Sequence, residues 1–196
     1  MQPEKLYHIY NHANGAENLF REVENYRYFL RQWEKHIQPV AYSLAYCLMP
    51  NHFHFLIKIR EQLELETTFG KFQTFQKLEY HLSKQFSNFF SSYTQAYNKK
   101  YGRKGSLFSP NFKKKEIASD EYISRVIAYI HLNPLHHRFT ENLGQWPFCS
   151  YSAYTENKPT LLHLDYALEW FGGREALIEF HHNYLTRTSE LEEGIR

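Results

Sequence analysis

Five stretches of the chain are expected to form helices. In residues 22–36, 69–97 and 122–133, apolar side chains recur at three- and four-residue steps, the spacing that gives a helix one buried face. Pro134 is expected to end the third helix, because proline lacks an amide hydrogen and restricts the residue before it. Two shorter helices are predicted at residues 164–171 and 174–184.

Four other stretches favour strands, because they are rich in aromatic and β-branched residues. They are residues 6–12, 40–49, 52–59 and 106–117. Only Pro50 and Asn51 separate the second from the third, so these two are predicted to pair as an antiparallel hairpin. Pro110 favours an edge position for the fourth.

The third strand has two chemically different faces. Side chains alternate along a strand, so one face carries His52, His54 and Lys58. The other face carries the apolar residues Phe53, Phe55, Ile57 and Ile59. The apolar face is expected to enter the core, which leaves the histidine face for chemistry.

The order of these elements predicts an α+β fold. Strand, helix, strand, strand, helix, strand and helix follow one another, which suggests a ferredoxin-like antiparallel sheet with helices packed on one face. A short helical C-terminal extension follows it.

Length and composition are those of one domain with a short appendage. The chain has 196 residues, of which 42% are hydrophobic. No stretch approaches the roughly 20 apolar residues of a membrane span, and the N-terminus lacks the apolar segment of a secretory signal. We therefore expect a cytoplasmic protein with no membrane partner.

The formal net charge is only +2, but the charges are unevenly distributed. Between Tyr80 and Lys115 there are eight basic residues and no Asp or Glu. Such a block favours an anionic partner. The candidate contacts are Lys99, Lys100, Arg103, Lys104, Lys113, Lys114 and Lys115.

The histidine pair is a candidate metal site. Two neutral imidazoles can hold a divalent ion and leave positions open for a substrate oxygen. Asn133 is the candidate third ligand, because it lies one helical turn after Tyr129 and an amide oxygen suits a hard cation. On spacing alone, however, the pattern is more typical of two hydrogen-bonded histidines on a half-exposed sheet.

Five motifs, in order along the chain, resemble those of the HUH single-tyrosine transposases, in particular the REP-associated tyrosine transposases and their insertion-sequence relatives. They are residues 7–11, Met-Pro-Asn-His-Phe-His-Phe-Leu-Ile at 49–57, the basic turn at 93–108, Tyr-Ile-His-Leu-Asn-Pro at 129–134, and 146–151. The likeness covers roughly residues 5 to 155, so we expect a catalytic domain at 1–155 and a C-terminal extension at 156–196. Relatives usually carry arginine and glycine where this chain has His12 and Ala13, so their DNA contacts at that point are not carried over.

The resemblance implies a single-stranded DNA endonuclease and strand transferase. In this family a tyrosine attacks a phosphodiester, which leaves a 5′-phosphotyrosine and a free 3′-hydroxyl that later rejoins or transfers the strand. Tyr129 is the expected nucleophile, because Tyr122 has the apolar Val126, rather than an asparagine, one turn later. Tyr122 is expected to pack or to contact a phosphate.

A divalent ion is the only cofactor expected. A phenol has a pKa near ~10 and is a poor nucleophile at neutral pH, so a bound cation must polarise the phosphate. His52, His54 and Asn133 would hold Mg²⁺ or Mn²⁺. The basic residues would follow the backbone of a single-stranded or hairpin DNA.

Two other functions stay open at the level of the sequence. One is a domesticated protein that binds DNA hairpins without cleaving them, and the other is a metal-dependent phosphoesterase that uses activated water. The sequence also leaves open a monomer or a homodimer, and with it whether one chain completes the site.

Overall fold

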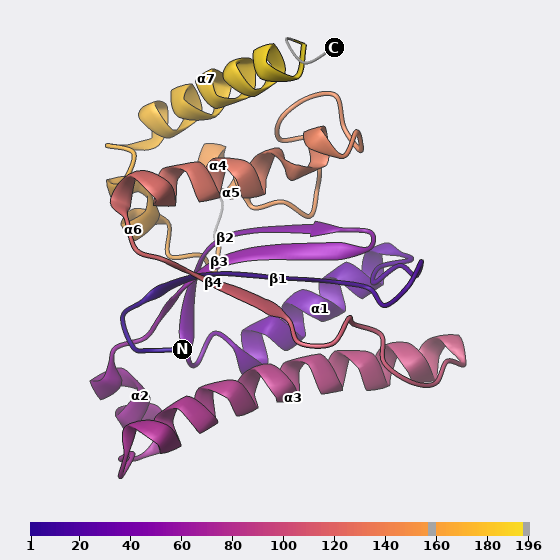
Figure 1. Cartoon of the computed structure of the whole chain (residues 1–196), viewed down its shortest axis with the longest axis vertical. Helices are drawn as coiled ribbons and strands as arrows, with labels where there is room; N and C mark the ends of the chain where they lie inside the picture. The colour runs from indigo at the N-terminus through magenta and orange to yellow at the C-terminus, as the bar shows by residue number, and fades with distance from the viewer. Residues whose placement is uncertain (157–159, 194–196) are drawn as a thin grey trace.

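The centre of the molecule is a four-stranded antiparallel sheet with the order β2-β3-β1-β4 (Figure 1). The computed structural model describes residues 1–156 and 160–193. The strands are β1 Leu6–His12, β2 Ala41–Met49, β3 His52–Ile59 and β4 Lys113–Ile117. Because β3 lies between β1 and β2, the sheet has the split arrangement of ferredoxin-like folds. The predicted α+β class and antiparallel sheet are confirmed.

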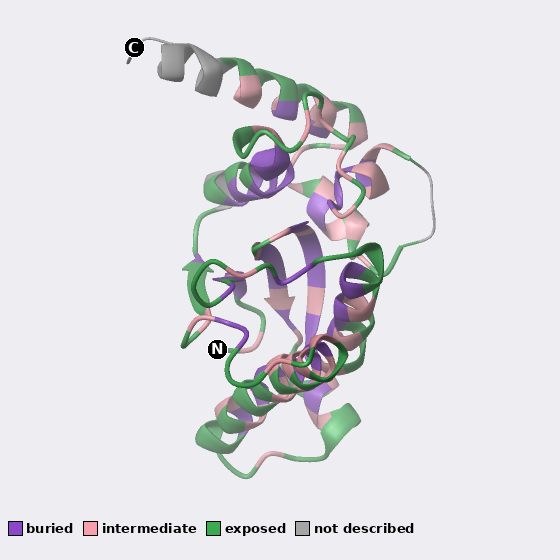
Figure 2. Ribbon diagram, turned by 90° about the vertical axis from the view of Figure 1, so that its right-hand side faces the viewer, coloured by how far each residue is buried: buried purple, intermediate pink, exposed green. Residues whose placement is uncertain are grey.

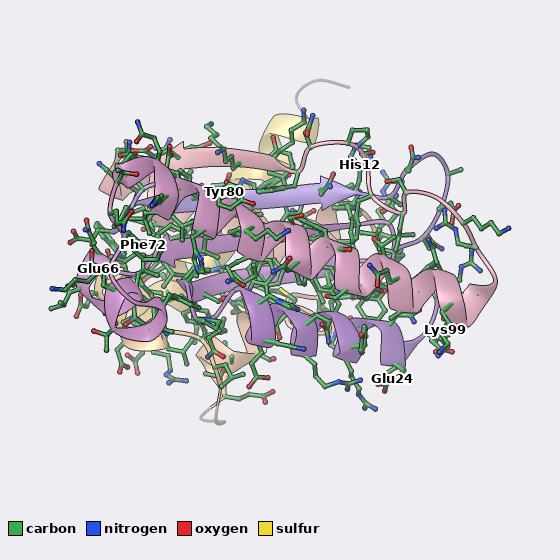
Figure 3. The ribbon with its side chains drawn as sticks, turned by 90° about the horizontal axis from the view of Figure 1, so that it is seen from below. His12, Glu24, Glu66, Phe72, Tyr80 and Lys99 are labelled. Atoms are coloured by element: carbon green, nitrogen blue, oxygen red, sulfur yellow. The ribbon has the colours of Figure 1, made fainter. Side chains whose placement is uncertain are left out.

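Helices cover both faces of this sheet (Figure 1). On one face lie α1 Val23–His36 and α3 Phe75–Tyr101, which run side by side (Figure 3). On the other lie α4 Asp120–His136, α5 Tyr151–Thr155, α6 Leu164–Glu169 and α7 Arg174–Glu193. The prediction that helices pack on one face only is therefore wrong. The histidine face also carries Leu44 and Leu56, which are fully buried in one cluster with apolar side chains of α4, so this face needs a cover as well.

The predicted division of β3 into two faces is confirmed. Phe53, Phe55, Ile57 and Ile59 are all buried in the core shared with α1 and α3, and most residues of β1, β2 and β3 are buried (Figure 2). The ring of Trp33 stacks on that of Phe55 with 3.6 Å between centroids. This dense aromatic layer fixes the register of β3, because a slip of one residue would exchange its two faces.

Several boundaries differ from the prediction, and α7, expected at 174–184, extends to Glu193. The helix expected at 69–97 is α3, which begins later, at Phe75, because Gly70 with φ 86° precedes it; the separate helix α2 Gln62–Phe69 was not predicted. Strand β4 is shorter than expected, since Pro110 and the left-handed Asn111 (φ 58°) precede it. Helix α4 continues past Pro134 to His136, so the missing amide falls in its last turn.

Candidate active site

The structure brings the predicted metal ligands and the predicted nucleophile together between β3 and α4. His52 Nε2 lies 3.3 Å from Asn133 Oδ1. The ring of His54 lies edge-on to that of Tyr129, with 5.6 Å between centroids, and 5.3 Å from that of His52. All four side chains therefore belong to one site, although two elements far apart in the sequence supply them.

The hydrogen bonds around His52 and Asn133 leave two acceptors facing each other. His52 Nδ1 donates to Asn51 Oδ1 (2.7 Å), so the neutral ring has a lone pair on Nε2. Asn133 Nδ2 donates to the carbonyl of Tyr129 (3.2 Å), which turns Oδ1 toward His52. A nitrogen lone pair and an amide oxygen that face one another suit a shared cation.

Carboxylates and cysteines contribute nothing to this donor set. In the part of the chain that the structure describes, no three His, Cys, Asp or Glu side chains are arranged to hold a metal ion. An ion here would depend on the two histidines, the buried amide oxygen of Asn133 and oxygens of water or substrate. That composition fits Mg²⁺ or Mn²⁺ with open positions.

A third histidine, which the sequence did not single out, belongs to the same site. His8 on β1 is buried, and its Nε2 lies 3.0 Å from Nδ1 of His54. The rings of His8 and Tyr129 meet edge-on at 6.1 Å. The signal that could have found it is the alternation of residues 6–12, which places His8 and Tyr10 on one face of β1.

Burial keeps these three imidazoles neutral. Burial, followed by the neighbouring His8, lowers the pKa of His54 to about 2. Burial, followed by the charge of Lys115, lowers the pKa of His8 to about 4. The pKa of His52 is also lowered by burial, and its contact with Asn133 opposes this shift. Neutral rings are the form that can bind a metal.

A cleft of about 470 Å³ opens beside this site. Its lining includes His8, Tyr10, His54, Lys115, Tyr122, Arg125, Tyr129 and Tyr184, and none of its described residues is an Asp or Glu. Two cationic side chains in an aromatic cleft favour an anionic, stacking ligand.

Tyr122 and Tyr129 differ in their surroundings. Both are 37% exposed. The Tyr122 hydroxyl accepts a hydrogen bond from Lys115 Nζ (2.9 Å), and this ammonium also lies 4.7 Å from the centre of the Tyr122 ring. Of these two tyrosines, only Tyr129 has ring contacts with His54 and His8 among the described residues.

The predicted DNA-binding residues form two separate groups. Lys113, Lys114 and Lys115 are exposed on the edge strand β4, where Lys115 is opposite His8. Lys99, Lys100, Arg103 and Lys104 lie at and beyond the end of α3, which Figure 3 marks with Lys99.

The two groups have different neighbours. Lys100 forms an ion pair with Glu22, and Arg103 one with Glu17, so the fold supplies carboxylates to a block that has none in sequence. Of the seven residues, all of them described, only Lys115 lines the cleft.

No helix of the described residues has the length and apolar character needed to cross a membrane. No family model matches the sequence, and none of the curated proteins matches it. A solved structure of a REP-associated tyrosine transposase bound to a REP hairpin is similar, with a TM-score of 0.52 and 15% sequence identity over 82% of this chain and 85% of that chain. This chain therefore has the fold of a REP-associated tyrosine transposase.

Proposed function

We propose that this chain is a member of the HUH tyrosine transposases that cuts and rejoins single-stranded DNA through a phosphotyrosine on Tyr129. The observation that carries the proposal is the position of Tyr129 and Asn133 on α4 against His52 and His54 on β3. The DNA hairpin bound by the structurally similar transposase supports DNA as the partner.

The chain's own residues suit the two halves of the reaction. The Tyr129 oxygen attacks the phosphorus and loses its proton, and the bond to the 3′-oxygen breaks, so that this oxygen leaves as a hydroxyl. The reverse attack by a 3′-hydroxyl restores the phenol and rejoins a strand. The phosphodiester energy is kept in the phosphotyrosine, so no nucleotide cofactor is required.

His52, His54 and Asn133 would hold Mg²⁺ or Mn²⁺ during both halves. When bound, such an ion supplies positive charge that polarises the phosphate and stabilises its developing negative charge. Lys115 and Arg125, which line the cleft, would bind and orient the flanking phosphates. Burial of the histidines keeps them available as neutral ligands at physiological pH.

A site completed within one chain, in a monomer or a homodimer, is part of this proposal, as is a position in the cytoplasm. The support for the first is that, inside one chain, His54 meets the ring of Tyr129, and Asn133 meets His52 and the Tyr129 carbonyl. Residues 1–155 would form the catalytic domain. The extension contributes Tyr184 of α7 to the cleft.

Covalent trapping tests the function. The protein is incubated with hairpin DNA that carries a single-stranded flank and with Mn²⁺, and the denatured sample is examined for a protein–DNA adduct. We expect an adduct with the wild type and none with Tyr129→Phe, while Tyr122→Phe still forms it.

Each alternative function has its own outcome in this experiment. Cleavage that survives in Tyr129→Phe without any adduct would favour a phosphoesterase that uses water. Tight binding of the hairpin with no cleavage by the wild type would favour a domesticated binding protein.

A further inference from the structure

The contact between His8 and His54 goes beyond the proposed reaction. We propose that His8 is a positioning residue, whose Nε2 accepts the Nδ1 proton of His54 and so leaves His54 Nε2 unprotonated for a divalent ion. This inference rests on the proposed function, because it concerns the same ion. It assigns a role to a residue of β1 that is neither ligand nor nucleophile.

The first support is the length and burial of the contact. His8 Nε2 and His54 Nδ1 are 3.0 Å apart, and both side chains are buried. Two nitrogens at this distance share one proton when both rings are neutral. The proton lies on either His8 or His54, and the two arrangements leave opposite nitrogens of His54 with a lone pair.

The second support is the parallel with the other predicted ligand. His52 Nδ1 donates to Asn51 Oδ1 (2.7 Å), which leaves its Nε2 facing Asn133. His8 stands at Nδ1 of His54 as Asn51 stands at Nδ1 of His52. Both ligand rings would thus be oriented from the same ring position, and both would present Nε2.

The third support is the way in which β1 holds His8. In the sheet His8 is opposite Leu56, and Tyr10 is opposite His54, so His8 reaches His54 diagonally along one face. The ring of His8 is inclined at 25° to that of His54, with 5.1 Å between centroids, and lies 4.9 Å from that of Tyr10. This packing restricts rotation of the His8 ring, so its Nε2 stays directed at His54.

The affinity of the protein for Mn²⁺ tests this role apart from catalysis. Free Mn²⁺ is measured by electron paramagnetic resonance during titration of the full chain. His8→Phe keeps a ring but loses the acceptor, and we expect its dissociation constant to rise about 10- to 100-fold. His8→Gln retains an acceptor and is expected to recover part of this loss.

The matched control is Tyr7→Phe, a change in the same strand on the opposite face, whose hydroxyl accepts a bond from the Gln2 amide. We expect it to leave the Mn²⁺ affinity unchanged. An unchanged affinity in both His8 variants would overturn the positioning role.

Nitrogen-15 NMR of the histidine rings decides the matter without a variant, which matters if His8→Phe does not fold. In the wild type with Mg²⁺, the Nδ1 of His54 is expected to carry the proton and Nε2 to carry none. The opposite tautomer contradicts the inference even if the trapping experiment succeeds. A wild type that binds no Mn²⁺ and forms no adduct contradicts both proposals. If the wild type forms the adduct but both His8 variants keep the wild-type Mn²⁺ affinity, only the positioning role of His8 is contradicted.

Discussion

Two pairs of buried histidines in this molecule have nearly the same geometry and opposite surroundings. His8 and His54 have nitrogens 3.0 Å apart and ring centroids 5.1 Å apart, with 25° between the ring planes. His131 of α4 and His181 of α7 have nitrogens 2.9 Å apart and rings at 5.0 Å and 25°. The first pair opens on the cleft, and the second lies inside the core between two helices.

Every ring nitrogen of the core pair has a partner, and the partners fix the direction of each bond. The carbonyl of Leu177 can only accept, so His181 Nδ1 donates to it (2.7 Å) and His181 Nε2 accepts from His131. His131 Nε2 then accepts from the Ser150 hydroxyl (2.8 Å), whose oxygen accepts from the Tyr46 amide. This network is complete only when both rings are neutral, and it holds α7 on α4.

The difference shows what separates a scaffold histidine from a candidate ligand. In the core pair all ring positions are used to join elements of the fold. At the cleft, the ring of His54 packs against His8 of β1 and meets the ring of Tyr129 edge-on. Burial alone is shared by both pairs, so it does not identify a site.

The largest expected effect is the loss of catalysis when the cleft pair is broken. We predict that His54→Asn lowers the rate of adduct formation by on the order of 10²–10³, the usual cost of removing one group that stabilises transition-state charge. The free energy of unfolding should fall by only about 1 kcal/mol, because a polar group remains in place. Single-turnover trapping and urea unfolding measure the two quantities. A large loss of stability with unchanged trapping would make His54 a scaffold residue.

The converse is expected for the core pair. We predict that His181→Phe lowers the free energy of unfolding at pH 7.5 by about 1–3 kcal/mol, because it leaves the His131 Nδ1 hydrogen without a partner and removes the side-chain bond to the Leu177 carbonyl. Burial lowers the pKa of His181 to about 4, against about 6.5 in an unfolded chain. As the pH falls, the unfolded chain binds the proton first. Stability contributed by the neutral ring is therefore present above pH ~6.5 and is lost as the pH falls toward about 4, by up to about 3 kcal/mol.

The pH dependence separates this effect from a simple packing defect. Urea unfolding between pH 7.5 and 4.5, with a chelator present, should give a shallower slope for His181→Phe than for the wild type. His182→Gln changes the exposed neighbour, whose charge has the smallest influence on the pKa of His181, and serves as the control with nearly the wild-type slope. If His181→Phe retained the wild-type slope, the core pair would not be the origin of the acid sensitivity.

The sequence predicted the geometry within single elements better than the contacts between elements. Alternation placed Phe53 and Phe55 in the core, and helical spacing placed Asn133 one turn from Tyr129; both depend on local geometry alone. His8 was missed because its contact with His54 depends on which strand lies beside β3. The contact of His131 with His181 depends on the docking of α7, so no local pattern shows it.

Charge was the least predictable property, because ion pairs form across the fold. A block without Asp or Glu in sequence receives Glu17 and Glu22 from the segment before α1. The placement of helices on the second face of the sheet was likewise missed, since the apolar residues that require them, such as Leu56, lie close to the histidines in sequence.

The smallest expected effect concerns DNA affinity, which is compared between the cleft and the end of α3. We predict that Lys115→Ala, beside His8 in the cleft, weakens hairpin binding several-fold and lowers the slope of log affinity against log salt by about 1. Lys100→Ala is the matched control, because this lysine is already paired with Glu22 and should change the slope by much less. Fluorescence anisotropy over a series of salt concentrations measures both. Equal changes would mean that DNA also covers the end of α3, and the cleft would then be one part of a longer binding surface.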